Sequence, residues 1–108
     1  MSSFKEFHDL DIKLGKVLEC HEISDSESLL ELKVDVGEEK PRKIISAIKE
    51  WYKPEDLIGE FVLIATNLKL DSLNSEGFLL AVDADNSAVL LKPDPIYKAK
   101  IKPGMKLA

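Results

Sequence analysis

The chain has 108 residues, of which 44% are hydrophobic and 32% are charged, and this composition predicts one soluble globular domain over residues 1–108. No purely apolar run exceeds five residues, and acidic residues interrupt the first dozen positions, so we expect neither a transmembrane helix nor a signal peptide. The single cysteine, Cys20, excludes an intrachain disulfide and favours a reducing, cytoplasmic location.

Charge is distributed unevenly along the chain. Fifteen lysine and arginine residues stand against twenty acidic residues, which gives a net charge of −5. Residues 92–108 carry five lysines and one aspartate, a charge of +4, whereas residues 1–91 carry ten basic and nineteen acidic residues, a charge of −9. A strongly basic nucleic-acid-binding protein would show the opposite balance, so any contact with a polyanion must be local.

The first predicted element is a short N-terminal helix. Ser3 and Glu6 match a capping box, and Phe4 and Phe7 would lie on one face of the helix. We therefore expect residues 1–9 to form a helical arm that precedes the main fold.

Alternating apolar and polar residues predict short strands along most of the remaining chain. Residues 29–36 alternate most cleanly, and residues 11–20 alternate around an interruption at Gly15 that predicts a β-bulge. Further apolar runs predict strands at residues 43–48, 61–66, 77–83 and 88–92. Pro54 and Gly59 bracket a short predicted helix between the third and fourth strands.

This order of elements predicts an all-β fold. Five or six short strands with one small helix are typical of a closed or partly closed barrel, although a β-sandwich of similar size fits the same pattern. Residues 93–108 follow the last strand as a C-terminal extension.

The sequence lacks the motifs of common enzymes. It has no glycine-rich phosphate loop, no nucleophile elbow and no paired-histidine zinc motif, so we expect a noncatalytic protein without a cofactor or metal. Cys20 and His21 are adjacent in a strand and would point to opposite faces, which favours a buried cysteine and an exposed histidine over a shared metal site.

The most informative segment is residues 67–76, which are polar and lie between two strongly apolar strands. In a five-stranded barrel this segment would join strands four and five, and such barrels bind oligonucleotides with that loop. An ordinary surface loop would account for the same residues, so the pattern alone leaves both interpretations open.

Motifs along nearly the whole chain resemble the tRNA-binding OB-fold domain family. They occur in order at residues 10–17, 34–38, 44–48, 52–59, 67–69, 75–81 and 103–104. This family includes C-terminal domains of methionyl-tRNA synthetases, free-standing beta subunits and CsaA-type chaperones. The resemblance implies a five-stranded OB-fold Greek-key barrel, with a short helix between strands three and four and another at the N-terminus.

The resemblance also implies a function. It points to a noncatalytic protein that recognises structured tRNA and acts in trans as a beta subunit of a methionyl-tRNA synthetase, an aminoacyl-tRNA synthetase. The alternative is a CsaA-like chaperone that binds unfolded or pre-secretory polypeptides. The RNA contacts that it implies come from Lys13, Lys16, Asn67, Lys69, Ser75, Glu76 and Phe78.

Several of these residues have an equally simple structural interpretation. Lys13 and Lys16 fit solvated strand positions. Phe78 is in phase with apolar residues two and four positions later, which favours core packing. Glu76 can only accept hydrogen bonds and would repel phosphate, so we expect it to hold the loop through backbone N–H groups.

The last expectation concerns assembly. A helix that bears Phe4 and Phe7 has no place inside a small complete barrel, and free-standing members of the resembling family are homodimers. We therefore predict a two-fold homodimer in which this helix packs with the C-terminal residues Ile101, Met105 and Leu107.

Overall fold

The structure is a computed structural model that describes residues 4–107, apart from the side chains of Phe4, Lys5 and His8. Its elements are α1 (Phe4–Asp9), β1 (Ile12–Glu22), β2 (Leu30–Asp35), β3 (Arg42–Ser46), α2 (Pro54–Leu57), β4 (Phe61–Ala65), η1 (Asp71–Leu73), β5 (Phe78–Leu79), β6 (Ala81–Ala84), β7 (Ser87–Leu90) and η2 (Pro95–Lys100). No described helix is long and apolar enough to cross a membrane.

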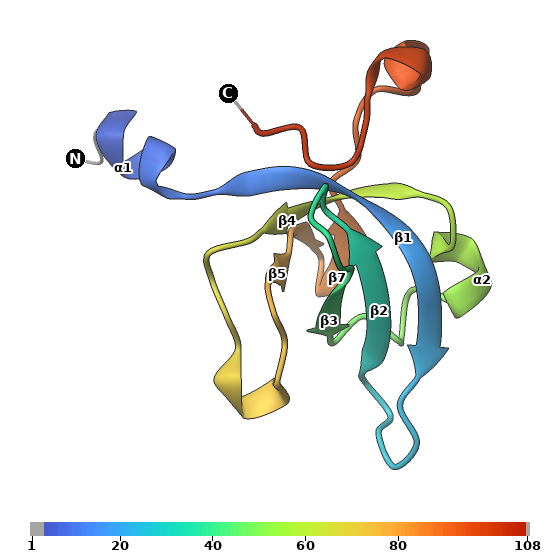
Figure 1. The fold of residues 1–108 in the computed structure, drawn as a ribbon. Coiled ribbons are helices and arrows are strands. Elements are labelled where there is room, and N and C mark those ends of the chain that lie inside the picture. The colour runs from blue at the N-terminus through green and yellow to red at the C-terminus, as the bar shows by residue number, and fades with distance from the viewer. Residues whose placement is uncertain (1–3, 108) are drawn as a thin grey trace.

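Five strands form one antiparallel sheet in the order β3-β2-β1-β4-β5, and the sheet curls into a nearly closed barrel (Figure 1). The barrel closes where the chain entering β5 meets β3. There the backbone N–H of Glu76 donates to the carbonyl of Lys43 at 2.8 Å, and the N–H of Ile45 donates to Ser75 Oγ at 2.9 Å. The barrel predicted from the sequence is confirmed, with α2 between β3 and β4 as expected.

The long strand β1 pairs with two neighbouring strands. Residues 12–16 pair with β4, and residues 16–22 pair with β2. Gly15 lies where these halves meet, and a Cβ at this position would come within 2.4 Å of the Val34 side chain, so the fold requires glycine. The irregularity in register lies between Val17 and Glu19, slightly later than the bulge expected at Gly15.

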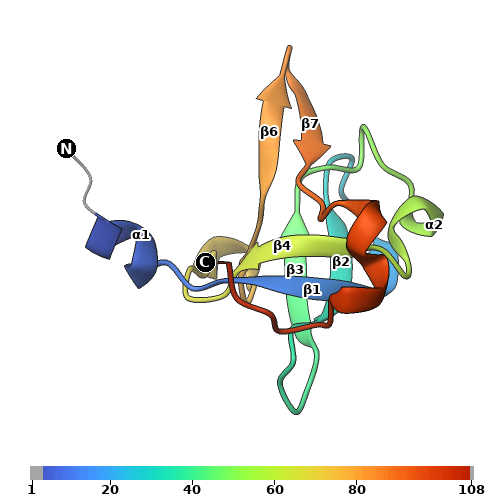
Figure 2. The ribbon, with the colours of Figure 1, turned by 90° about the horizontal axis from the view of Figure 1, so that it is seen from above.

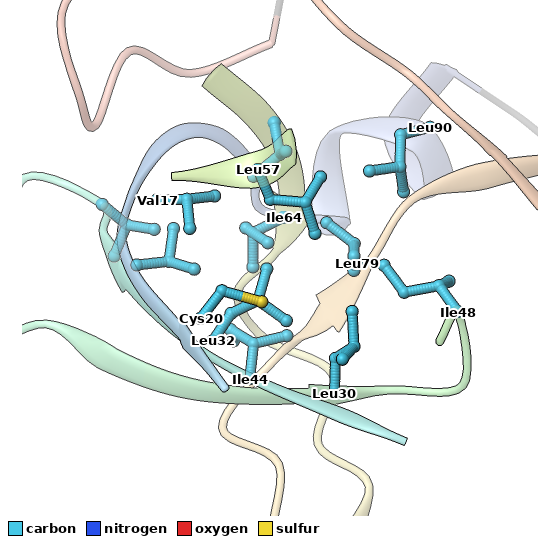
Figure 3. Packing of buried hydrophobic residues seen from close by; sticks show 13 residues of the cluster. Val17, Cys20, Leu30, Leu32, Ile44, Ile48, Leu57, Ile64, Leu79 and Leu90 are labelled. Carbon is cyan, nitrogen blue, oxygen red and sulfur yellow. The ribbon is translucent and has the colours of Figure 1, made fainter. Parts of the chain in front are cut away.

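The alternating pattern of residues 29–36 corresponds to one buried face of β2. Leu30, Leu32 and Val34 are fully buried and contribute to a single apolar cluster inside the barrel (Figure 3). Leu57 of α2 is buried in the same cluster, so the short helix covers one end of the barrel. Burying this apolar surface is the main stabilising contribution to the fold.

Cys20 and His21 point to opposite faces of β1, as the sequence predicts. Cys20 is buried in the core, and burial raises the pKa of its thiol to about 11, with a smaller contribution from Glu55. His21 is exposed, and its Nε2 lies 3.2 Å from Glu19 Oε1. The thiol therefore behaves as an apolar core group.

The single strand predicted at residues 77–83 is interrupted at Leu80. The Leu80 N–H bonds to Leu63 in the barrel, whereas its carbonyl accepts a hydrogen bond from Leu91. The chain then continues as β6, which pairs only with β7 in a hairpin that projects from the barrel (Figure 2). Asp85 and Asn86 form the two-residue turn with φ values of 52° and 68°, as in a type I′ turn.

The C-terminal segment, residues 101–107, packs beside the first half of β1. The N–H groups of Gly104 and Leu107 donate to the carbonyls of Leu14 and Ile12 at 2.8 and 2.7 Å. Gly104 also lies against Gly37, and both have positive φ; a Cβ on either would approach the backbone of the other to within 2.9 Å. This contact fixes the C-terminal segment on the barrel.

The predicted N-terminal helix is confirmed as α1. Its residue Phe7 is 40% exposed, whereas the predicted capping residue Ser3 lies outside the described residues.

Candidate nucleic-acid interface

Residues 67–76 form the loop between β4 and β5, as predicted, and both ends of this loop are fixed to the barrel. At its C-terminal end, the Glu76 carboxylate accepts a hydrogen bond from the Lys43 N–H at 2.7 Å. The sequence predicts this role for Glu76, in which its carboxylate accepts a hydrogen bond from a backbone N–H group. Ser75 is 3% exposed, and its hydroxyl accepts from Ile45 and donates to the carbonyl of Gly77 at 2.7 Å.

Arg42 joins the two ends of the loop. Its Nη1 donates to the carbonyl oxygens of Thr66 and Glu76, one at each end. Its Nε and Nη2 bind both oxygens of Glu38, each at 2.8 Å. This bidentate pair lowers the pKa of Glu38 and raises that of Arg42, mainly through the hydrogen bonds between them. We call this arrangement the Arg42 clasp.

Asp11 extends the same polar network towards the N-terminal arm. Its carboxylate accepts the Thr66 hydroxyl at 2.6 Å and lies 3.6 Å from Lys13 Nζ and 3.9 Å from Lys106 Nζ. The hydrogen bond from Thr66, followed by the two cations, lowers the pKa of Asp11. The predicted residue Lys13 therefore lies beside the start of the loop and is paired with the Asp11 carboxylate.

Asn67 connects the loop to the arm. Its Oδ1 accepts the Asp11 N–H at 3.0 Å, and its Nδ2 donates to the carbonyl of Asp9 at 2.6 Å. The amide group expected to contact RNA is therefore engaged on both sides by the chain itself. In this arrangement Asn67 positions the loop.

A groove of about 380 Å³ separates the loop ends from the turn between β2 and β3. It is lined by Glu38, Glu39, Lys40, Pro41, Arg42, Lys69 and Glu76. Glu38 and Arg42 neutralise each other, and the Glu76 carboxylate is bound to backbone. The predicted residue Lys69 and the neighbouring Lys40 have no carboxylate partner among the described residues, so they are the cations that remain available to a ligand.

Two predicted residues are placed differently from expectation. Phe78 is 40% exposed while the next residue, Leu79, is buried, so the prediction that Phe78 packs in the core is wrong. The reason is that β5 ends after two residues, and the alternation extrapolated from Val82 belongs to another sheet. Ser75 is buried and its hydroxyl is hydrogen-bonded within the chain, so its side chain is not accessible to RNA.

Lys16 is separated from the loop. It is exposed on β1 and pairs with Phe61 at the start of β4, whereas Ala65, at the end of β4 nearest the loop, pairs with Ile12. Four strand residues correspond to about 13 Å. The structure therefore brings Lys13, Asn67, Lys69 and Glu76 together but leaves Lys16 elsewhere.

Arg42 is the site residue that sequence reasoning missed. It is the only arginine in a chain with fourteen lysines. A guanidinium offers five donors in a rigid fork, which a lysine cannot replace. The presence of a single arginine, at the start of a strand, was the sequence feature that could have indicated this role.

Comparison with known proteins identifies the family to which the chain belongs. Residues 12–105 match the model of the putative tRNA-binding domain. The chain belongs to this family. The methionine–tRNA ligase of Methanothrix thermoacetophila is 46% identical over an alignment of 94 positions, which covers 84% of this chain but only 14% of that relative. The chain thus spans a small part of the synthetases that it matches.

Solved structures share the fold over the full chain. The MetRS-related protein from Pyrococcus horikoshii superimposes with a TM-score of 0.85 at 24% identity, covering 100% of this chain and 98% of that one. The chaperone CsaA from Bacillus anthracis str. Ames gives a TM-score of 0.81 at 28% identity, covering 100% and 99%. The chain is therefore related both to a synthetase domain and to CsaA.

Proposed function

We propose that this protein is a noncatalytic, cytoplasmic tRNA-binding protein that acts in trans as a beta subunit of a methionyl-tRNA synthetase. The observation that carries the proposal is the match of residues 12–105 to the putative tRNA-binding domain. The relatives named methionine–tRNA ligase support the link to a synthetase, in which the corresponding domain is one part of a longer chain.

The proposed RNA surface is the 67–76 loop with the groove beside it. Lys69 and Lys40 would neutralise phosphates, and the exposed ring of Phe78 offers a surface on which a base can stack. The Arg42 clasp supports this role because it holds both loop ends before any ligand arrives, which reduces the entropy lost on binding.

The test is a titration of bulk tRNA at several salt concentrations. If three or four lysines each neutralise one phosphate, log affinity should fall against log salt with a slope of about −2 to −4. Lys69→Gln should reduce the magnitude of this slope by about one, whereas Lys53→Gln, at the exposed residue that precedes α2, should leave it unchanged. Failure of the wild-type protein to bind tRNA at low salt would contradict the proposal.

A homodimer is part of the proposal. Phe7, Met105 and Leu107 are each about 40% exposed, and Ile101 is half-buried, so α1 and the C-terminal segment present apolar surface. Phe4 belongs to the same predicted interface, but its side chain lies outside the described part of the chain. Light scattering should give twice the chain mass of 12.1 kDa, and Met105→Ser with Leu107→Ser should shift the protein towards the monomer.

A chaperone function is the second candidate. The similarity to CsaA supports it, as do the exposed apolar side chains of Leu68 and Phe78 at the two ends of the loop. An unfolded peptide that displaces tRNA from the protein, or that binds when tRNA does not, would favour this candidate.

A further inference from the structure

A second groove lies on the other side of the barrel from the loop groove, between the start of β4 and η2. It has a volume of about 290 Å³, and its apolar lining includes Phe61, Pro93 and Pro95. Lys92 and Lys98 line it. Figures 1 and 2 show η2 projecting above the barrel, with the C-terminal segment running from η2 along β1. We call this the C-terminal groove.

Lys16 belongs to the surroundings of this groove. It pairs directly with Phe61 across β1 and β4, and directly opposed residues project from the same face of a sheet. The side chain of Lys16 therefore emerges beside the Phe61 ring. The lysine that is separated from the loop therefore lies next to Phe61, which lines the same groove as Lys98.

The carboxylates around the groove are already engaged. Glu60 lies 3.2 Å from Lys92 Nζ, and the Asp94 side chain accepts the N–H of Ile96 at 2.9 Å. Asp35, which opposes Lys16 on β2, accepts the N–H of Gly37. Lys16 and Lys98 have no ion pair among residues 4–107, so their charges are available to an anionic ligand.

The charge distribution along the whole chain also favours an anionic ligand at this groove. Residues 92–108 carry +4, while the rest of the chain carries −9. Beyond Lys98, Lys102 is exposed and unpaired within the described residues, and Lys100 lies over the ring of Tyr97 at 5.6 Å. A polyanion is therefore least repelled where it approaches η2.

We propose that the C-terminal groove is a second contact site for the phosphate backbone of RNA. Lys16 and Lys98 each neutralise a phosphate, and the apolar wall around Phe61 packs against a sugar or base between them. This inference rests on the proposed function, because it assigns a second contact to the same RNA that binds at the loop. A single free phosphate would lack the repeated charges that the two lysines and the adjoining segment match.

The test compares the salt dependence of tRNA binding in three variants. Lys16→Gln with Lys98→Gln removes two positive charges from the C-terminal groove. Lys53→Glu changes the net charge by the same amount at the exposed residue that precedes α2, and Lys69→Gln removes one positive charge from the loop. The double variant should reduce the magnitude of the slope by about 1.5, whereas Lys53→Glu should leave the slope near that of the wild type.

A second measurement uses the unmodified protein. Acetylation of lysines with and without bulk tRNA, read by mass spectrometry, should show protection at Lys16 and Lys98 but none at Lys53. This measurement stays informative if a substitution disturbs folding.

The outcomes separate the two proposals. If Lys69→Gln reduces the slope but the double variant does not, and Lys98 is unprotected, RNA does not bind at the C-terminal groove. The proposed RNA surface at the loop would then still stand. The reverse pattern supports the groove and contradicts the loop surface. A wild-type protein that binds no tRNA at low salt overturns both. If the double variant loses self-association while the slope is unchanged, the lysines serve protein contacts and the inference is wrong.

Discussion

The 67–76 loop and the β6–β7 hairpin follow one another along the chain, yet different interactions hold them. The loop has almost no regular structure, but its ends are bonded to two other segments, to β3 through Arg42 and Glu76 and to the N-terminal arm through Asn67. The hairpin is regular and has a favourable turn, but all four residues of β6 are exposed. Regular backbone pairing therefore does not indicate which of the two segments is better anchored to the barrel. Polar contacts between residues far apart in sequence indicate it.

The largest effect should come from breaking the Arg42 clasp. Arg42→Met removes the hydrogen bonds to both loop ends and to Glu38, and it leaves two carbonyl oxygens without that donor. We expect the free energy of unfolding to fall by about 2–3 kcal/mol, measured by urea denaturation. Arg42→Lys, which keeps the charge without the fork, should cost less. An unchanged urea midpoint for Arg42→Met would contradict the importance of the clasp.

A smaller effect is expected from Asn67→Ala, which separates the loop from the arm. The loss of two hydrogen bonds should reduce stability by about 1–2 kcal/mol and accelerate hydrogen exchange at the Asp11 amide. Ser72→Ala, in the middle of the same loop, is the matched control and should leave both quantities unchanged. Equal exchange at Asp11 in the two variants would show that Asn67 does not hold the arm.

Acid should loosen the loop before it affects the hairpin. The pKa values of Asp11 and Glu38 are lowered in the folded protein, so the unfolded chain binds protons more readily. The stability that they contribute is present above the ordinary carboxyl pKa of about 4 and is lost as the pH falls through the lowered values. Urea midpoints measured down to about pH 3 should fall less in Arg42→Met than in the wild type, because Glu38 has lost its partner. A parallel decline in both proteins would argue against this linkage.

The smallest effect should come from the hairpin. Val82 and Val89 oppose each other and are 48% and 43% exposed. Replacing both with threonine should change the stability of the chain by less than about 0.5 kcal/mol. A loss of about 2 kcal/mol would mean that these valines are buried in solution, and the contrast with the loop would then disappear.

Local patterns were enough to predict most of the barrel. The alternation in residues 29–36 became the buried face of β2, and Pro54 and Gly59 correctly marked the helix that caps the core. The interruption at Leu80 was not predictable in this way. Residues 78–82 are uniformly apolar, and only the three-dimensional arrangement decides which of them pair with β4 and which with β7.

The candidate site was predicted less completely, because its main contacts link residues far apart in sequence. Ser75 and Asn67 are polar loop residues, a pattern that favours solvent or ligand contact. Their hydrogen-bond partners lie 30 and 56 residues away, and no local signal reports them. Glu76 was interpreted correctly because its chemistry alone argues against a phosphate contact.

The contact between Gly37 and Gly104 bears on how one edge of β1 is covered. Residues 104–107 occupy the edge of β1 that β4 leaves free, so they satisfy backbone groups at Ile12 and Leu14 that would otherwise face another molecule. An uncovered strand edge of this kind is a template for intermolecular β-sheet growth. Any side chain at Gly104 would press against the backbone at Gly37 and displace this cover. The close approach of the two glycines is therefore what allows the C-terminal segment to cover this edge.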